Sequence, residues 1–218
     1  KKFSEYVVEQ VNYKKYHPFS GKILVLGYGS VGQAIVPLLL RHLDISSSQI
    51  TVLERDNNKA LFNKRHGGSG IKYVRKEILP GNYEKELAKH VDAGGMIVNC
   101  SLNIDAESIL IWCAENNVMQ VDTSLERWHF DQDENYPNPA KRTLYDTHNK
   151  IRKTMAKYPN APTCVVTHGA NPGYVTHLTK RVLLEIAKKK GIPAETPVDR
   201  EDWAQLMKKV GVKVVHIA

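Results

Sequence analysis

The segment Gly27-Tyr28-Gly29-Ser30-Val31-Gly32 decides the fold class of this 218-residue chain, because it fits the pattern GxGxxG. The pattern alone is common in proteins. Here it follows a β-rich apolar run at residues 22–26 and opens a helical pattern at residues 31–43. A strand, a glycine turn and a helix in this order predict a dinucleotide-binding βαβ unit.

The three glycines of this segment have different expected roles. Gly27 permits the tight turn, Gly29 lets the backbone approach a pyrophosphate, and Gly32 lets the helix pack closely on the strand. The free N–H groups at the helix N-terminus favour phosphate. A glycine turn without a ligand is the alternative, and the βαβ context disfavours it. The expected cofactor-binding residues of this segment are Gly27, Gly29, Ser30, Val31 and Gly32.

Glu54 lies 22 residues beyond Gly32, at the expected end of the second strand. A carboxylate at this place accepts hydrogen bonds from both ribose hydroxyls and repels a 2′-phosphate, so it favours NAD over NADP. The adjacent Arg55 weakens this discrimination, and Asp56 is a second candidate for the ribose. The alternative for Glu54 is a solvated charge at a strand end.

Strand-like and helix-like patterns alternate along the chain after the glycine segment. They predict a Rossmann-type, doubly wound parallel sheet whose ligand lies at the carboxyl ends of the strands. Further strands are expected at residues 49–55, 71–78, 95–100, 118–124 and 162–167. Further helices are expected at residues 56–66, 82–91, 105–117, 140–157, 174–190 and 199–210, with a last strand at 212–217.

The same patterns suggest three parts of the chain. Residues 1–20 lack clear periodicity and are expected to form an N-terminal arm. Residues 21–173 are expected to form the dinucleotide-binding domain, and residues 174–218 the start of a second, α+β substrate domain. The chain begins without Met and stops after an apolar run, so we expect it to be part of a longer protein.

The composition is that of a globular protein, with 42% hydrophobic and 25% charged residues. The net charge of +8 is uneven. Residues 1–140 hold 16 Lys/Arg and 17 Asp/Glu, a net charge of −1, whereas residues 141–218 hold 15 and 6, a net charge of +9. Most of the late lysines lie in helical patterns, where solvated faces explain them better than a nucleic-acid partner does.

Three cysteines, Cys100, Cys113 and Cys164, form no CxxC pair, which argues against a disulfide framework and a zinc site. No apolar run approaches the roughly 20 residues that cross a membrane, and no signal peptide is visible. These features predict a cytoplasmic protein with no bound metal and no membrane or nucleic-acid partner.

Residues 99–103 follow the fourth expected strand at the ligand edge of the sheet. The small polar side chains of Asn99, Cys100 and Ser101 suit contact with the ribose or nicotinamide of a cofactor, and capping of the following helix is an equal alternative. Cys100 has no base or cation beside it in sequence, so a nucleophilic role is not expected.

Residues 122–128 follow the fifth expected strand at the same edge. Asp122 and Thr123 are expected near the cofactor. Glu126 is a candidate for binding a cationic substrate group, and Trp128 for covering a cation with its ring; a surface loop with one packed Trp is the alternative. The polar residues beyond it lack metal-ligand spacing and are taken as solvated charges: His129, Asp131, Asp133 and Glu134.

Residues 168–173, with the sequence HGANPG, end the sixth expected strand and begin a helix. The glycines on either side of the Asn-Pro pair, Gly169 and Gly173, allow the backbone to approach a flat ring, and Gly169 and Ala170 are expected to contact the cofactor. Asn171 can donate and accept hydrogen bonds at once, so it suits a nicotinamide carboxamide or a substrate amine. The alternative is a turn before a helix. His168 is either an acid–base group or a structural histidine.

Taken together, these segments resemble the bacterial homospermidine synthases, a family of the saccharopine dehydrogenase-like group. The resemblance covers almost everything from Lys22 onward. It rests on residues 27–32, 99–103, 122–128 and 169–173, on Glu201-Asp202-Trp203, and on residues 212–218.

This resemblance implies a reaction in which bound NAD oxidises putrescine to an imine, ammonia is lost, a second putrescine condenses, and NADH reduces the new imine. NAD is thereby recycled, and the full-length enzyme is expected to be a homodimer. Glu126 and Asn171 are then expected to be catalytic: Glu126 corresponds to an acidic residue of the substrate site, and Asn171 to an asparagine near nicotinamide and substrate. Asn103 stands where a relative carries aspartate, and with Trp128 is expected to bind substrate.

Two other functions remain open at this stage. One is a related reductase of the saccharopine or carboxynorspermidine type, whose carboxylated substrates call for a cation near the substrate loop. Arg127 is the only such residue in its segment. The other is a protein that binds NAD without catalysis.

Overall fold

The computed structural model describes residue 15 and residues 17–128, 138–193 and 195–216. The chain divides into two compact units, Lys1–Val166 and Thr167–Ala218, which are described separately below. The expected domain boundary after residue 173 lies a few residues beyond this division, and the domain assignment stays a prediction.

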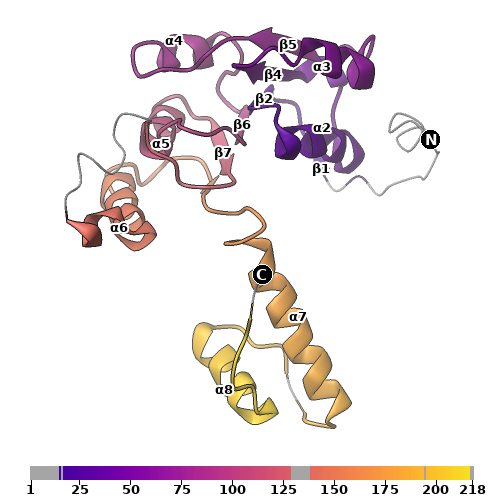
Figure 1. The fold of residues 1–218 in the computed structure, drawn as a ribbon, viewed down its shortest axis with the longest axis vertical. Helices are drawn as coiled ribbons and strands as arrows, with labels where there is room; N and C mark the ends of the chain where they lie inside the picture. The colour runs from indigo at the N-terminus through magenta and orange to yellow at the C-terminus, as the bar shows by residue number, and fades with distance from the viewer. Residues whose placement is uncertain (1–14, 16, 129–137, 194, 217–218) are drawn as a thin grey trace. The chain divides into compact units, whose positions relative to one another are not determined.

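The first unit is built on a parallel sheet, which in the described residues has six strands in the order β5-β4-β2-β6-β7-β8 (Figure 1). The sheet grows from β2 in one direction through β4 and β5, and in the other through β6, β7 and β8, as in a doubly wound fold. The predicted fold class is confirmed. The strands are β2 Ile23–Leu26, β4 Ile50–Glu54, β5 Lys72–Arg75, β6 Met96–Asn99, β7 Met119–Asp122 and β8 Cys164–Val165.

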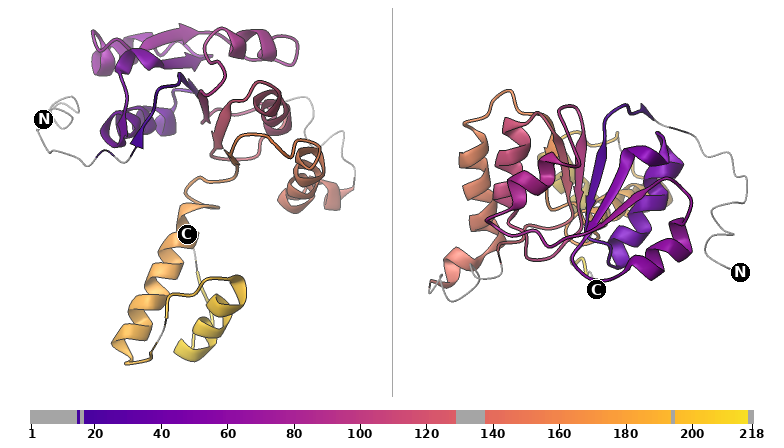
Figure 2. Two further views of the ribbon diagram at one scale, coloured as in Figure 1. Left: turned by 180° about the vertical axis from the view of Figure 1, so that it is seen from behind. Right: turned by 90° about the horizontal axis from the view of Figure 1, so that it is seen from above.

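Helices cover both faces of this sheet, as the right-hand view of Figure 2 shows. On one face, α2 and α3 pack through Val36 and Phe62 on Ile23 and Val25. The other face carries Leu24 and Leu26 under residues of α4 and α5. Strand β2 is thus buried on both sides, which explains its uninterrupted apolar sequence. The helices are α2 Ser30–His42, α3 Lys59–His66, α4 Tyr83–Ala88, α5 Ala106–Glu115 and α6 Leu144–Met155.

Short elements complete the first unit. β1 His17–Pro18 pairs in parallel with β3 Leu43–Asp44. Residues 1–14 and 16 lie outside the described chain, and the expected N-terminal arm at residues 1–20 stays a prediction. Short 3₁₀ helices occur at η1 Ser47–Gln49 and η4 Pro139–Arg142. The predicted helix at 140–157 is thus divided at Thr143, whose side chain caps α6 by accepting from Asp146 N–H.

The second unit contains two helices in its described residues, α7 Tyr174–Lys189 and α8 Arg200–Val210. They pack through Leu183, Ala187, Leu206 and Val210. The strand expected at 212–217 is wrong for its described residues, 212–216, which form no strand. A strand needs a hydrogen-bonded neighbour, and the described part of this unit offers none there.

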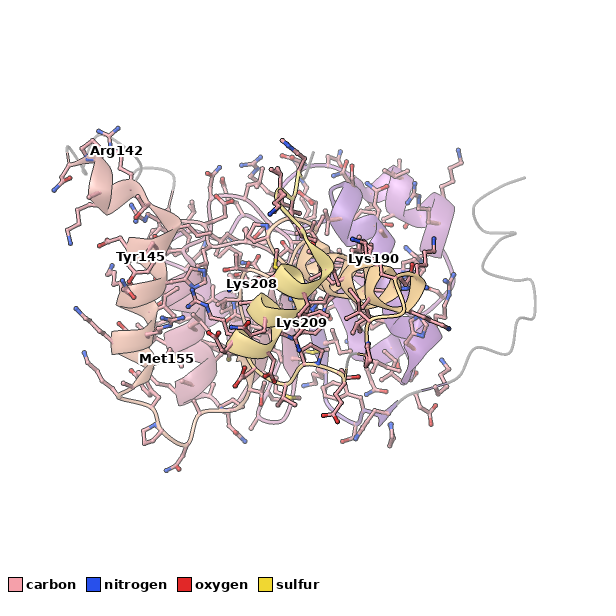
Figure 3. All side chains as sticks on the ribbon, turned by 90° about the horizontal axis from the view of Figure 1, so that it is seen from below. Arg142, Tyr145, Met155, Lys190, Lys208 and Lys209 are labelled. Atoms are coloured by element: carbon pink, nitrogen blue, oxygen red, sulfur yellow. The ribbon has the colours of Figure 1, made fainter. Side chains whose placement is uncertain are left out.

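Lysines gather at the helix ends of the second unit. Lys190 follows α7, while Lys208 and Lys209 lie in the last turn of α8 (Figure 3). Lys190 Nζ donates a 2.8 Å hydrogen bond to Val210 O, and cations at helix C-termini also complement the helix dipole. Among the described residues, no helix is long and apolar enough to span a membrane.

Candidate functional site

A cavity of about 410 Å³ opens in the first unit, where β2, β4, β5 and β6 end. This is the edge at which doubly wound sheets bind ligands, as predicted. The glycine loop contributes Gly27, Gly29, Ser30 and Val31, the end of β4 contributes Leu53–Asp56, and further lining comes from residues 76–80, 100–104 and Trp128.

Two glycines of the loop have separate structural consequences. A Cβ on Gly32 would lie 2.1 Å from Gly27 O, so only glycine lets α2 approach the loop this closely. A Cβ on Gly29 would meet no atom within 4 Å and would project into open space beside the cavity it lines. Gly32 therefore builds the loop, whereas Gly29 leaves room for a ligand.

Tyr28, between the loop glycines, turns away from the cavity and is fully buried. Its ring makes edge-on contacts with Phe62 of α3 and Tyr73 of β5, at centroid distances of 5.4 and 6.3 Å. The Tyr73 hydroxyl donates to Asp56 O at 3.0 Å and accepts from Asn58 N–H at 3.1 Å. The glycine loop and the turn after β4 are thus attached to one aromatic cluster, which the sequence did not reveal.

Glu54 is buried at the end of β4 and lines the cavity. Its carboxylate accepts hydrogen bonds from the backbone N–H groups of Tyr28 and Asp56, the latter at 2.8 Å. Since a carboxylate has about four acceptor positions, capacity remains for ribose hydroxyls. Glu54 therefore fixes the glycine loop to the turn after β4 and keeps an acceptor beside the cavity.

A hydrogen-bonded network lies behind the loop that follows β6. Asn99 and Asp122 are paired across β6 and β7, and both are 1% exposed. Asn99 Nδ2 donates to Asp122 Oδ2 at 2.8 Å, and Asn99 Oδ1 accepts from the Ser101 hydroxyl at 2.5 Å. Asn99 and Asp122 do not line the cavity, whereas Ser101 does. Cys100, the residue before Ser101, lines the cavity as well.

Burial changes the pKa values of two groups here. It raises the pKa of Asp122 to about 6, against the opposing effect of hydrogen bonds from Ser124, Asn99 and Gln120. Burial also raises the pKa of the Cys100 thiol to about 12, and the charge of Asp122 adds to the effect. A thiol that stays protonated is a poor nucleophile, in agreement with the role expected for Cys100.

The raised pKa of Asp122 predicts how this group contributes to stability. Its ordinary value is 3.8, so the folded state retains a proton that the unfolded state has released between about pH 4 and pH 6. The contribution of Asp122 to the free energy of unfolding should therefore fall by roughly 2–3 kcal/mol as the pH rises across this window.

The measurement is a set of urea unfolding curves between pH 4 and pH 7 for the wild type and Asp122→Asn. Because other carboxylates titrate in the same range, the quantity to compare is the difference between the two proteins. A difference that stays constant with pH would contradict the assignment.

The predicted substrate residues of the first unit take different positions. Asn103 and Trp128 line the cavity. Trp128 is also buried in the core against Tyr83, with ring centroids 5.9 Å apart. Glu126 is half-buried and does not line the cavity; its backbone oxygen accepts from Ala106 N–H at 3.0 Å. Arg127 donates from Nη2 to Lys141 O and to Thr147 Oγ1.

The other predicted cofactor residues differ in their relation to this cavity. Gly32, Asn99, Asp122 and Thr123 do not line it, although Thr123 N–H donates to Asn99 O at 3.2 Å. His129, Asp131, Asp133 and Glu134 lie outside the described residues.

The HGANPG segment belongs to the second unit and forms a tight turn of its own. Gly169 and Gly173 form a β-bridge, and Tyr174 N–H returns to Gly169 O at 2.9 Å. Asn171, at its tip, is exposed. The ring of His168 contacts that of His177 edge-on at 5.3 Å.

Residues 76–80 line the cavity, although nothing in the sequence identified them as site residues. The expected strand extended to residue 78, whereas β5 ends at Arg75 and leaves Lys76–Pro80 as a loop at the strand ends. The apolar Ile78 and Leu79 continue the strand pattern, so hydrophobicity alone could not locate the end of β5. Only the fold, which brings the third strand end to the ligand edge, identifies this loop.

The glycine loop, the strand-end carboxylate and the cavity between them define the class of Rossmann folds that bind dinucleotides. Residues 23–166 match the family model described as the saccharopine dehydrogenase NADP binding domain. The match covers well over half of the chain, and the chain belongs to this family.

Relatives extend the comparison beyond this domain. The chain is 34% identical to homospermidine synthase of Mesorhizobium japonicum over 216 residues, and 31% identical to that of Blastochloris viridis over 210 residues. These alignments cover 95% and 93% of this chain but only 43% of each relative. The predicted resemblance to homospermidine synthases is confirmed.

A solved structure gives the same result. The crystal structure of homospermidine synthase from Legionella pneumophila in complex with NAD superposes with a TM-score of 0.73 and is 26% identical in sequence. The superposition covers 89% of this chain and 39% of that one.

Proposed function

We propose that this chain is the cofactor-binding part of an NAD-dependent homospermidine synthase. The observation that carries the proposal is the reach of the similarity. The saccharopine dehydrogenase model ends at residue 166, whereas the alignments with two homospermidine synthases cover at least 93% of the chain. The similarity therefore includes much of the second unit, beyond the domain shared by the broader group.

The cavity fits NAD in two respects. Gly29 leaves open space where a phosphate can approach the backbone, and Glu54 keeps acceptor capacity for ribose hydroxyls. The charge of Arg55 is matched by Asp56, to which its Nε donates at 3.2 Å. Lys76 also lines the cavity, so the site does not lack a cation that could meet a 2′-phosphate. The preference for NAD over NADP is therefore assigned to the carboxylate of Glu54, which repels that phosphate.

NAD held by the glycine loop and Glu54 would supply reversible hydride chemistry, accepting a hydride from an amine and donating it to an imine. The residues of this chain are proposed to stabilise the charge that develops on the substrate and to hold the substrate and the nicotinamide in position. Glu126 is proposed to stabilise the positive charge that develops as the amine becomes an iminium, an effect stronger in the transition state than in the ground state. Asn171 is proposed to hold the carboxamide or the amine, and Asn103 and Trp128 to contact the substrate.

Within residues 122–128, the contacts of Arg127 favour a diamine over a carboxylated substrate, whereas Arg55 and Lys76 line the cavity as cations. A saccharopine-type reductase needs a cation for the substrate carboxylate, and Arg127 was the candidate. Its guanidinium instead contacts Lys141 O at 3.1 Å and Thr147 Oγ1 at 2.9 Å, which ties the residue 127 segment to the start of α6. Putrescine as the diamine, a homodimeric assembly and a cytoplasmic location remain predictions.

The test uses the full-length protein. Nucleotide released by denaturation should be identified as NAD by mass spectrometry, and incubation with putrescine should yield homospermidine and ammonia without net accumulation of NADH. Turnover of saccharopine or carboxynorspermidine instead would favour the related reductases. Retained NAD with no turnover of any amine would indicate a non-catalytic protein.

A further inference from the structure

We propose that Asp122 and Asn99 act as positioning residues that orient the Ser101 hydroxyl. Ser101 then presents only lone pairs to the cavity and accepts a hydrogen bond from a ligand hydroxyl or ammonium group. The inference rests on the proposed function only in taking the cavity as the ligand site. It changes the expected role of Asn99 and Asp122, which were predicted to contact the cofactor themselves.

The first step is the orientation of the Asn99 amide. An ionised carboxylate has no proton to donate. Asp122 Oδ2 accepts from Asn99 Nδ2 at 2.8 Å and from Gln120 Nε2 at 3.2 Å, while Asp122 Oδ1 accepts from Ser124 N–H at 2.9 Å. The amino group of Asn99 must therefore face Asp122, and its carbonyl oxygen faces the opposite way.

The second step is the use of the single proton of Ser101. Asn99 Oδ1 accepts from Ser101 N–H at 3.2 Å and from the Ser101 hydroxyl at 2.5 Å. A serine hydroxyl has one proton and two lone pairs. Because the proton is engaged with Asn99, the side of Ser101 that lines the cavity can only accept.

An acceptor at this place selects the chemistry of the group beside it. Hydroxyl and ammonium groups are donors and satisfy it, whereas a phosphate or carboxylate oxygen would be repelled. A donor can come from a ribose hydroxyl of the dinucleotide or from the ammonium group of an amine substrate. Both share this chemistry, and the experiment below separates them.

Asp122→Asn should change the Ser101 hydroxyl from a hydrogen-bond acceptor to a hydrogen-bond donor toward the cavity. Asparagine offers one oxygen and one amino group in place of two oxygens, and the Ser124 N–H retains the oxygen. The amino group of the substituted side chain then faces the amino group of Asn99. Relief of this contact requires the Asn99 amide to flip, at the cost of the hydrogen bond that it accepts from the Ser101 N–H. The Asn99 amino group now donates to Ser101, and the serine proton points into the cavity.

The test is a double-mutant cycle of Ser101→Ala and Asp122→Asn, with the dissociation constant for NAD measured by calorimetry and KM for putrescine measured on the full-length protein. Each single variant should weaken the same constant by about tenfold, the effect of one hydrogen bond, and the double variant should be no worse than Ser101→Ala alone. A change in the NAD constant identifies a ribose donor, and a change confined to KM identifies the amine.

The exchange variant Asn99→Asp/Asp122→Asn is the matched control. It keeps one carboxylate and one amide, but the carboxylate at position 99 again accepts the Ser101 proton. Wild-type affinity should return to within about threefold, since the polarity of Ser101 is restored. Asn99→Asp alone, which places two carboxylates side by side, should not recover it.

The dependence on pH gives a readout that a purely structural role would not produce. Among the residues that the structure describes, the charged and titratable groups that act on Asp122 or feel its charge are Glu126, on its own loop, and Cys100, after β6. Protonation of Asp122 makes it a donor, like the asparagine variant. Affinity should therefore fall as the pH drops through about 6 in the wild type, and not in Asp122→Asn.

Several results would overturn the proposal. Additive effects of Ser101→Ala and Asp122→Asn would do so, as would a folded exchange variant that still binds about tenfold more weakly. No change in either constant for Ser101→Ala would exclude a ligand contact. If Asp122→Asn does not fold, Ser101→Ala and the exchange variant still test whether Ser101 contacts a ligand and whether residues 99 and 122 orient it. The NAD measurement is independent of the product formed, so failure of the synthase activity would be seen separately.

Discussion

Gly32→Ala is expected to lower the free energy of unfolding of the first unit by about 3 kcal/mol. The added Cβ would lie 2.1 Å from Gly27 O, and neither partner in this overlap is a flexible side chain. Relief requires the start of α2 to move away from the glycine loop. Because that movement also displaces the cavity wall, binding of NAD should be lost together with stability. Urea unfolding and calorimetric titration measure the two effects.

Gly29→Ala is the control for this prediction. Gly29 has a φ of −69°, which alanine adopts readily, and its Cβ would meet no atom within 4 Å. Stability should therefore stay within about 0.5 kcal/mol of the wild type. Affinity for NAD should still fall at least tenfold, because the methyl group occupies space beside the phosphates. Equal loss of stability in both variants would refute the separate roles of the two glycines.

Glu126→Gln is expected to lower kcat of the full-length enzyme by about 10²- to 10³-fold, with little change in the affinity for NAD. Glutamine keeps the size and shape of the side chain but removes the negative charge that is proposed to stabilise the iminium. The change should leave the fold intact, because the hydrogen bond from Ala106 N–H reaches the backbone oxygen of residue 126.

A second carboxylate provides a matched control for this substitution. Glu107 pairs with Lys150 at 2.8 Å and accepts from Thr154 at 2.6 Å, so its charge has partners within the first unit. Glu107→Gln should retain wild-type kcat. Single-turnover measurements of NADH formation would locate the defect of Glu126→Gln in the oxidation step. A wild-type rate in that step would remove Glu126 from the catalytic role.

The sheet was predictable because its strands are buried and its turns are marked by glycine. The run before Gly27 is apolar throughout, since α2 and α3 cover one face of the sheet and α4 and α5 the other. The prediction of a last strand at residues 212–217 was wrong for the described residues 212–216, because no neighbouring strand is present there. Val214 and Val215 fit a strand by composition, but a strand forms only against a neighbour.

The site was predictable at the level of loops but not of individual contacts. Asn99 and Asp122 lie at the expected strand ends, yet they face each other across β6 and β7 and reach the cavity only through Ser101. Sequence shows that polar residues end these strands, and not which of them bond to one another. The burial of the Tyr28 ring could not be predicted for the same reason, because its aromatic partners come from α3 and β5.

The position of Trp128 gives the cavity an optical reporter of its own. Its indole is buried in the core and also forms part of the cavity wall, so its emission comes from the wall of the site itself. Indole emission overlaps the absorption band of a reduced nicotinamide. Because Trp112 and Trp203 emit as well, the difference in quenching between the wild type and Trp128→Phe would follow the redox state of a bound dinucleotide in real time and without a label.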